Sequence, residues 1–244
     1  IFRRAEHPYL QALLRAVPRF DMLPGERLAP IREIKSEGGA LLRAKEPWPD
    51  GADAAGPLLE VESITKRFTI RKAGLFAGRS NATALAVADV SLFIKRGECL
   101  GLVGESGCGK TTLSKILLRA LTPSAGAVRF NDRGRMVDVL KLEGDALFDF
   151  RRKVQFIFQD PFSSLNPRMT VFDIVSEPLI IHGIGDAAER ALRVKELMTL
   201  VGLDVRFLRR YPHSFSGGQR QGTGNADALA LQPELLICDE PVSA

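Results

Sequence analysis

The chain has 244 residues, of which 45% are hydrophobic and 26% are charged, and its formal net charge is +5. These proportions are ordinary for a globular protein. No run approaches the roughly 18 apolar residues of a membrane span, and the first residues show no signal-peptide pattern. The basic residues are scattered, which favours a solvated surface, or one beside an anionic membrane, over a nucleic-acid partner.

The three cysteines, Cys99, Cys108 and Cys238, lie in or beside expected core strands and a glycine-rich loop. Their odd number argues for reduced thiols in a cytosolic compartment rather than for a disulfide framework. They do not combine with the three histidines into the spacing of a metal site.

The first part of the chain differs from the rest in composition and in its apolar pattern. Residues 5–17 are predicted to form a short amphipathic helix. From 21 to 57, repeated prolines and glycines interrupt any sustained period, which predicts a linker. Because the chain opens with Ile1 rather than Met, we expect it to be a piece of a longer protein.

A globular domain is predicted to begin near Leu58, where alternating apolar and polar residues indicate a strand. The same alternation over 90–94 predicts a second strand. Residues 128–130 and 137–140 are separated by the turn sequence Asn-Asp-Arg-Gly, which predicts a hairpin.

The stretch Gly104–Thr111 has the Gly-x-x-x-x-Gly-Lys-Thr spacing of a phosphate-binding loop. An apolar run over 99–103 predicts a buried strand before it, and apolar spacing over 113–121 predicts a helix after it. The loop would then present backbone N–H groups to phosphate oxygens at a helix N-terminus. Lys110 is expected to reach the β- and γ-phosphates, and Thr111 to ligate Mg²⁺. The predicted nucleotide-binding residues of this stretch are Gly104, Glu105, Ser106, Gly107, Cys108, Gly109, Lys110, Thr111 and Thr112.

Beyond the loop, the apolar run 154–158 predicts a strand, and Gln159 follows it directly. Helices are predicted over 170–182 and 186–201, the second after a reciprocal capping signal. The apolar residues of the second helix that we expect to face a core are Leu192, Leu197, Met198 and Val201.

The apolar run 235–238 predicts a last strand that carries Asp239 and Glu240 at its end. Strands alternating with helices predict an α/β fold with a largely parallel sheet, in which ligands gather at the carboxyl ends of strands. Asp239 is expected to hold Mg²⁺ opposite Thr111, and Glu240 to orient or deprotonate an attacking water. Gln159 has two interpretations: a sensor of metal and water, or an ordinary cap of its strand.

A fourth motif, Ser216, Gly217, Gly218 and Gln219, offers a hydroxyl and bare backbone N–H groups at the start of an expected helix. It lies far in sequence from the phosphate loop. Two such anion-binding helix starts predict a site that is shared between two domains.

Together these motifs resemble the ATP-binding subunit of an ABC transporter over residues 58–244. Residues 104–111 are similar to the Walker A loop and Gln159 to the Q-loop. Ser216–Gln219 resembles the family signature, and Asp239-Glu240 the end of the Walker B strand. Other phosphate-loop ATPases lack the Ser-Gly-Gly-Gln signature, so the combination is specific.

Further stretches resemble the dipeptide and oligopeptide importer branch, namely 159–169, Tyr211–His213 and the first 20 residues, which are similar to a tail that follows the nucleotide-binding domain. A tail placed before a new domain implies a tandem fusion. The implied organisation is a tail of a preceding ATP-binding half over 1–20, a linker over 21–57, and an incomplete nucleotide-binding domain over 58–244 with a helical subdomain over about 160–230.

The resemblance implies a phosphate-loop NTPase fold with a RecA-like core, an antiparallel β subdomain and a helical signature subdomain. It implies an ATPase with ATP and Mg²⁺ as cofactors, which energises import of peptides or related solutes. The implied catalytic residues are Lys110, Gln159 and Glu240, and the metal residues are Thr111, Gln159 and Asp239. The implied partners are a second ATP-binding domain, membrane permease subunits and, indirectly, a solute-binding protein, without nucleic acid. The implied location is peripheral, on the cytoplasmic face of the inner membrane.

In that family an aromatic residue upstream of the loop stacks on adenine, and Phe68 is the best match, with core packing as the competing interpretation. The segment after Gln159 receives a coupling helix from the permease in the resembled importers. The residues expected to line an apolar groove for it are Phe162, Leu165, Met169 and Val171.

The chain departs from the family pattern in two places. Gly222–Asp227 brings two glycines, at about 0.8–1 kcal/mol each, and polar residues into the signature helix, which is therefore expected to be weak. The chain stops at Ala244, before the family's switch histidine, which predicts low stability and little ATP turnover for this chain alone. Two other functions stay open: a nucleotide-binding fragment without hydrolysis, and a soluble ABC-type ATPase acting on ribosomes or DNA. The importer-like stretches argue against the second.

Overall fold

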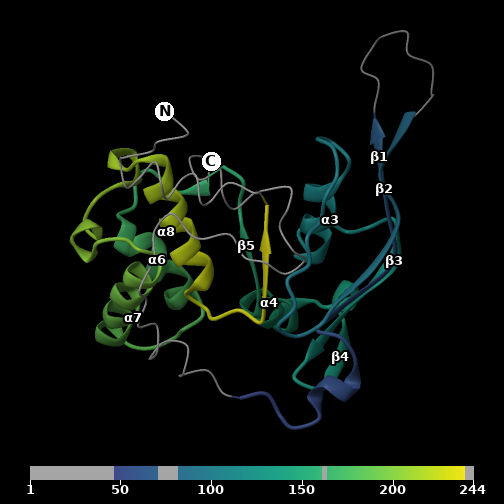
Figure 1. Ribbon diagram of the computed structural model, residues 1–244, viewed down its shortest axis with the longest axis horizontal. Helices are drawn as coiled ribbons and strands as arrows, with labels where there is room; N and C mark the ends of the chain where they lie inside the picture. Colours follow the sequence, from purple (N-terminus) through teal and green to yellow (C-terminus); the bar gives the residue numbers. More distant parts are fainter. Residues whose placement is uncertain (1–46, 71–81, 161–163, 240–244) are drawn as a thin grey trace, which may run out of the picture.

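The computed structural model describes residues 47–70, 82–160 and 164–239 (Figure 1). Within these ranges an antiparallel sheet, a small parallel sheet and a group of helices make up the fold. The predicted helix over 5–17 and the predicted catalytic residue Glu240 lie outside the described residues. No helix in the described part of the chain is long and apolar enough to cross a membrane.

The antiparallel sheet has the strand order β2-β1-β3-β4. Its strands are β1 (Leu59–Ile70), β2 (Ala82–Ile94), β3 (Ala125–Asp132) and β4 (Arg135–Asp138). The predicted strands near 58–64 and 90–94 and the predicted hairpin are therefore confirmed, although β1 and β2 are longer than predicted. Alternation decides which face is buried, because successive side chains of a strand point to opposite sides.

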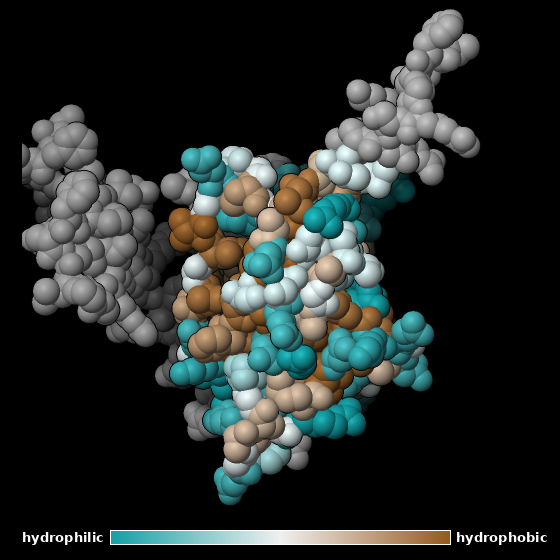
Figure 2. Space-filling view, turned by 90° about the vertical axis from the view of Figure 1, so that its right-hand side faces the viewer, coloured by the Kyte–Doolittle hydropathy of each residue, from teal (hydrophilic) through white to brown (hydrophobic). Residues whose placement is uncertain are grey.

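The two faces of β1 have different environments. Leu59 and Val61 are buried in a core that they share with Phe130 of β3. Glu60 and Glu62 point outward and both pair with Arg129, at 3.0 and 3.1 Å. Figure 2 shows the molecule from the side of this sheet, where hydrophilic side chains are interspersed with apolar patches.

A two-residue turn, Arg133 and Gly134, joins β3 to β4. Both residues have positive φ, 55° and 102°, which is the backbone of a type I′ hairpin turn and matches the twist of the strands. Asn131, which is buried, accepts a hydrogen bond from the Gly134 N–H at 2.7 Å. Its Nδ2 donates to the carbonyl oxygens of Ala52 and Gly56, both at 3.0 Å, so the short helix η1 (Ala52–Ala55) is held against the turn.

The parallel sheet consists of β5 (Val154–Ile157) and β6 (Leu235–Cys238), with Val154 opposite Leu235. These are the two strands that the apolar runs predicted. Their carboxyl ends lie at the same edge of the sheet (Figure 1).

The predicted buried strand over 99–103 is wrong. This segment has no regular secondary structure, and Leu100, Leu102 and Val103 are 44%, 46% and 94% exposed. A cavity of about 180 Å³ lies between Leu100 and Leu102 on one side and β6 on the other. A strand needs a neighbour that satisfies its backbone groups, and 99–103 pairs with none of the described strands.

Five α-helices are described: α3 (Lys110–Leu117), α4 (Gly144–Lys153), α6 (Val171–Ile181), α7 (Ala187–Leu200) and α8 (Gly217–Leu229). Three further 3₁₀ turns are η2 (Val139–Lys141), η3 (Val205–Phe207) and η4 (Pro212–Ser214). The helix after the phosphate loop and the two predicted after Gln159 are thus confirmed. Helix α3 packs into the core of the sheets, whereas α6, α7 and α8 share a second core.

Two expectations for this second core are wrong. Leu192 of α7 is 62% exposed, because the buried face of that helix is centred on Val194, Leu197 and Met198, on the opposite side. Val171, expected in a surface groove, is fully buried at the start of α6. Leu165 is buried as well, and Phe162 lies outside the described residues.

Helix α8 forms in spite of its unfavourable sequence. Thr223 is fully buried, and its hydroxyl donates to the Gln219 carbonyl at 3.0 Å, so the polar group does not remain unpaired. Gly222 faces Leu203, whose side-chain carbons would lie only 3.2–3.5 Å from an added Cβ. Tertiary packing therefore outweighs the low helix propensity of this stretch.

Candidate nucleotide-binding site

The turn before α3 has the backbone that a phosphate loop needs. Gly107 and Gly109 have φ values of 81° and 105°, a region that residues with a side chain rarely adopt. A Cβ at Gly109 would also stand 2.2 Å from the carbonyl oxygen of Ala86 in β2. Helix α3 begins at the next residue, so its N-terminal N–H groups face the loop.

Lys110 lies over this loop. Its ammonium group donates to the carbonyl oxygens of Gly104 at 2.7 Å and Glu105 at 2.9 Å. The Cys108 sulfur lies 3.8 Å from the same nitrogen. A cation held by main-chain carbonyls beside a helix N-terminus gives the site a positive potential, which suits a polyphosphate.

Two of the three predicted magnesium residues, Thr111 and Asp239, are brought together. The Thr111 hydroxyl donates to Oδ2 of Asp239 at 2.8 Å. The Asp239 N–H in turn donates to the carbonyl of Ile157 at 3.0 Å, so the end of β6 is held against the end of β5. A hydroxyl and a carboxylate are hard oxygen ligands of the kind that Mg²⁺ takes beside phosphate oxygens and water. The donor set therefore fits a magnesium–nucleotide complex.

Gln159 is exposed and follows β5 by two residues. Because Ile157 lies opposite Cys238 in the parallel ladder, Gln159 is at the same edge of the sheet as Asp239. Its placement suits either of the two interpretations given above.

The signature residues form a reciprocal cap at the start of α8. The Ser216 hydroxyl accepts from the Gln219 N–H at 3.4 Å, and Oε1 of Gln219 accepts from the Ser216 N–H at 3.0 Å. Gly217 and Gly218 are exposed in the first turn. Figure 1 shows α8 and α3 on opposite sides of β5 and β6, so this chain does not bring its own signature to its own phosphate loop.

Phe68 lies on β1, is 40% exposed, and has the Lys66 ammonium 5.2 Å from the centre of its ring. An exposed ring is not packed in the core, which removes the competing interpretation. Stacking on an adenine base stays a prediction for this residue.

One titratable group of α8 was not singled out from the sequence. Burial, with a contribution from the nearby carboxylate of Glu177 on α6, raises the pKa of Asp227 to about 7. Asp227 lines a small cavity with Phe158 and Ser164, next to the segment around Gln159. The only signal in the sequence was an acidic residue within a helix that must bury one face.

Another hollow, of about 1160 Å³, lies elsewhere. It opens on the outer face of the antiparallel sheet and is lined by Glu60, Phe93 and Arg96 among others. It contains none of the phosphate-loop residues, and we assign no ligand to it.

A glycine loop at the N-terminus of a helix, with a strand-borne carboxylate opposite, defines a phosphate-loop nucleotide-binding domain. A family model described as ABC transporter matches residues 87–243. The chain therefore belongs to the ABC transporter family.

The relatives are import and transport proteins. All 244 residues match the glutathione import ATP-binding protein GsiA of Pectobacterium atrosepticum at 41% identity, which covers 38% of that protein. A putative oligopeptide transport ATP-binding protein of Bacillus subtilis, YkfD, is 47% identical over 189 residues, 77% of this chain and 54% of the relative. The chain thus spans little more than a third of GsiA and about half of YkfD.

The fold is similar to a solved structure described as the dimeric post-hydrolysis state of the ATP-binding cassette MJ0796 bound to ADP and Pi. The TM-score is 0.65 at 32% identity, and the match covers 76% of this chain and 75% of the other. This likeness agrees with the predicted α/β ABC ATPase fold.

Proposed function

We propose that this chain is the ATP-binding and ATP-hydrolysing part of an importer for peptides or related solutes. The hydrogen bond from Thr111 to Asp239 carries the proposal, because it joins the end of the phosphate loop to the end of β6. The names of the relatives, glutathione import and oligopeptide transport, support the class of solute.

In the proposed mechanism Lys110 leaves its loop carbonyls to contact the β- and γ-phosphates, while the loop N–H groups hold their oxygens. Thr111 and Asp239 would hold Mg²⁺, which would neutralise charge at the phosphates. Gln159 orients the attacking water, and Glu240 accepts its proton. Phe68 stacks on the base. In phosphoryl transfer, catalysis comes mostly from positioning the reactants and from stabilising charge with groups that are already charged.

The same proposal includes the organisation of the longer protein. Residues 1–20 are assigned to the tail of a preceding ATP-binding half, 21–57 to a linker, and 58–244 to the nucleotide-binding domain. The last linker residues, from Trp48 to Gly56, pack against that domain. Ser216–Gln219 would face the phosphate loop of a second ATP-binding domain. Permease subunits would hold the protein at the cytoplasmic face of the membrane, with a solute-binding protein acting through them.

Binding of MgATP, measured by calorimetry on the 244-residue chain, tests the nucleotide site. We expect Lys110→Ala to weaken binding at least tenfold, because a charge-assisted contact is worth about 1.5–3 kcal/mol. Lys115→Ala is the matched control, since Lys115 lies exposed on the same helix. Equal affinities of the two variants would contradict the assignment.

The transport proposal needs its own test. Arg168 is exposed in the segment before α6. A cysteine in its place, in membranes that contain the co-expressed permease, is expected to cross-link to a permease subunit. Cross-links to soluble proteins alone would argue against an importer and leave the nucleotide site unaffected.

A further inference from the structure

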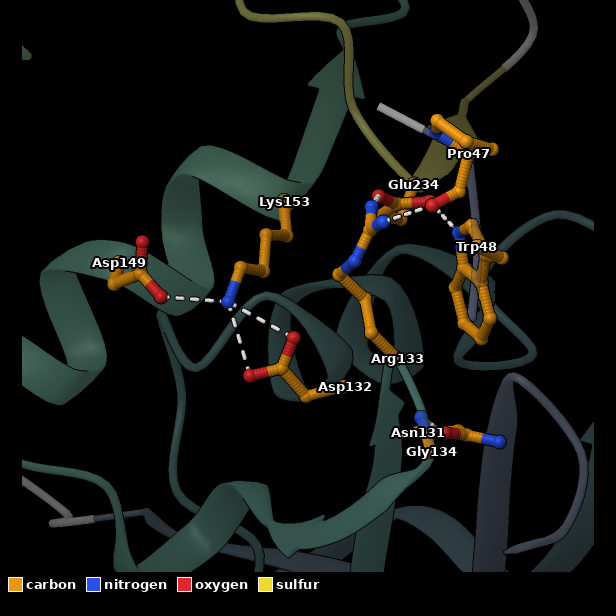
Figure 3. Close-up of polar contacts among 9 residues, drawn as sticks. All are labelled: Pro47, Trp48, Asn131, Asp132, Arg133, Gly134, Asp149, Lys153 and Glu234. Atoms are coloured by element: carbon orange, nitrogen blue, oxygen red, sulfur yellow. Dashed lines mark hydrogen bonds and ion pairs between the residues drawn. The ribbon is translucent and has the colours of Figure 1, made fainter. Parts of the chain in front are cut away.

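Two consecutive residues of the β3–β4 hairpin contact the bases of both parallel strands (Figure 3). Asp132 accepts two hydrogen bonds from the Lys153 ammonium, at 2.9 and 3.0 Å. The Arg133 guanidinium lies 3.8 Å from a carboxylate oxygen of Glu234. Lys153 directly precedes β5, and Glu234 directly precedes β6.

The contacts are partly withdrawn from water. The side chains of Asp132 and Lys153 are each 23% exposed, and that of Glu234 is 12% exposed. Partial burial would lower the pKa of Lys153, but its bonds to Asp149 and Asp132 outweigh this effect and raise it, so the group is charged at neutral pH. Shielded ion pairs of this kind hold geometry better than pairs on an open surface.

Each partner is held by more than one neighbour. Lys153 also contacts Asp149 at 2.6 Å. The other oxygen of Glu234 accepts from the indole N–H of Trp48 at 2.8 Å, and Arg133 donates to the Pro47 carbonyl. Arg133 and Trp48 thus contact the two oxygens of the Glu234 carboxylate, which limits its freedom and holds the start of β6.

The two strand bases are also joined to each other. The Glu234 N–H donates to the Lys153 carbonyl at 2.7 Å, and the ladder continues from Val154–Leu235 to Ile157–Cys238. Because β5 and β6 are only four residues long, a shift of one strand against the other at their first residues also shifts their last residues. The carboxyl edge of the sheet carries Gln159 and Asp239.

The backbone of the turn also indicates that Arg133 is held in place by its contacts. Arg133 has a φ of 55°, which is uncommon for a residue with a long side chain. A strained backbone persists only where its surroundings fix it. Here it is held by the contacts of Arg133 with Glu234 and Pro47, and by the Asn131 bond to Gly134.

We propose that Asp132 and Arg133 are positioning residues for the metal side of the nucleotide site: they set the stagger of β5 against β6 and thereby the placement of Asp239 opposite Thr111. This inference rests on the proposed function. It adds to the site two residues that contact the opposite end of the strands from Asp239.

The test compares ATP affinity with and without Mg²⁺, measured by calorimetry in magnesium buffer and in EDTA. Arg133→Met is expected to leave affinity in EDTA within twofold of the wild type, because the phosphate loop does not depend on this turn. The gain in affinity on adding Mg²⁺ is expected to fall three- to tenfold. Arg133→Lys should restore part of the gain. Arg135→Met is the matched control, since Arg135 is an exposed arginine of the same hairpin.

Trp48 provides a second measurement, because it is the only tryptophan of the sequence. Glu234→Gln keeps the shape of the side chain and removes its charge, so it serves if Arg133→Met fails to fold. It is expected to change the fluorescence emission of Trp48. Like Arg133→Met, it should also reduce the gain in ATP affinity on adding Mg²⁺. Two outcomes would overturn the proposal. One is that both folded variants gain as much ATP affinity from Mg²⁺ as the wild type does; the other is that they lose as much ATP affinity in EDTA as in magnesium buffer. A wild-type chain that binds no ATP would instead overturn the proposed function.

Discussion

The hydroxyl of Thr111 and the carboxylate of Asp239 form a hydrogen bond of 2.8 Å across 128 positions of the sequence. The bond links the first turn of α3 to the end of β6. Neither element contains a complete metal site, and none of the described residues form a cluster of three or more acidic, histidine or cysteine groups suited to a metal. The two oxygens lie together only because the fold brings the start of α3 against the end of β6.

The first prediction concerns this pair. Thr111→Val keeps the shape of the side chain and removes its oxygen, so we expect the magnesium-dependent part of ATP affinity to fall about tenfold or more. Thr111→Ser keeps the oxygen and should stay within about threefold of the wild type. Calorimetry with and without EDTA measures both. Equal magnesium dependence in valine and serine variants would show that Thr111 is not a ligand.

The second prediction is a pH dependence of stability. The folded-state pKa of Asp227 is about 7, raised from an ordinary 3.8. A raised pKa means that the contribution of this group to stability is complete below about pH 4 and is lost as pH rises through about 7. At about 1.4 kcal/mol per pKa unit, the loss is at most about 4 kcal/mol.

Asp227→Asn removes this titration. We expect the variant to be more stable than the wild type at pH 8, with the difference shrinking as the pH falls and nearly gone at about pH 4, as measured by urea unfolding. Glu177→Gln should give a smaller change in the same direction, because burial is the larger cause and Glu177 the smaller. Parallel pH profiles of wild type and Asp227→Asn would contradict the raised pKa of this carboxylate.

The third prediction separates the two glycines of α8. A Cβ at Gly224 would meet no atom within 4 Å, so Gly224→Ala is expected to stabilise the protein by about 0.5–1 kcal/mol. At Gly222 the same gain is opposed by contact with Leu203 at 3.2 Å. We therefore expect Gly222→Ala to give a smaller gain or none. Denaturant unfolding of the two variants, side by side, measures the difference.

The fourth prediction concerns the phosphate loop. Gly109→Ala places a carbon 2.2 Å from the Ala86 carbonyl oxygen, so the loop must move away from β2. We expect ATP affinity to fall at least tenfold while far-UV circular dichroism stays native. Gly101→Ala, where an added carbon meets nothing within 4 Å, is the control and should bind normally. Normal binding by Gly109→Ala would mean that the loop tolerates another backbone.

Much of the fold was readable from the sequence because local signals and burial agree. The alternation that begins near Leu58 predicted β1, and the apolar run before Asp239 predicted β6. Asp186 and Glu189 predicted the start of α7 at the right residue, and they do cap it. In each case the information lies within a few neighbouring residues.

The failures have a different origin. The segment 99–103 has the composition of a buried strand, but a strand depends on a partner that composition does not reveal. Leu192 was assigned to the core because it is apolar, although the angle between it and Leu197 places it on the outer face of α7. Of the candidate site, the loop was read from spacing alone, whereas the contact of Arg133 with Glu234 needed the structure.

The helices α6, α7 and α8 each begin with a reciprocal cap, formed by Thr170 and Asp173, Asp186 and Glu189, and Ser216 and Gln219. Such caps act over three residues, so each helix can nucleate from its own sequence. The strands β5 and β6 are separated by this whole helical region. Early packing of the helices would bring the two strands together and shorten the loop that their pairing has to close. The parallel sheet should therefore form after the helices have packed. A substitution in the helical core, such as Val194→Ala, should then slow the step that brings Asp239 to Thr111.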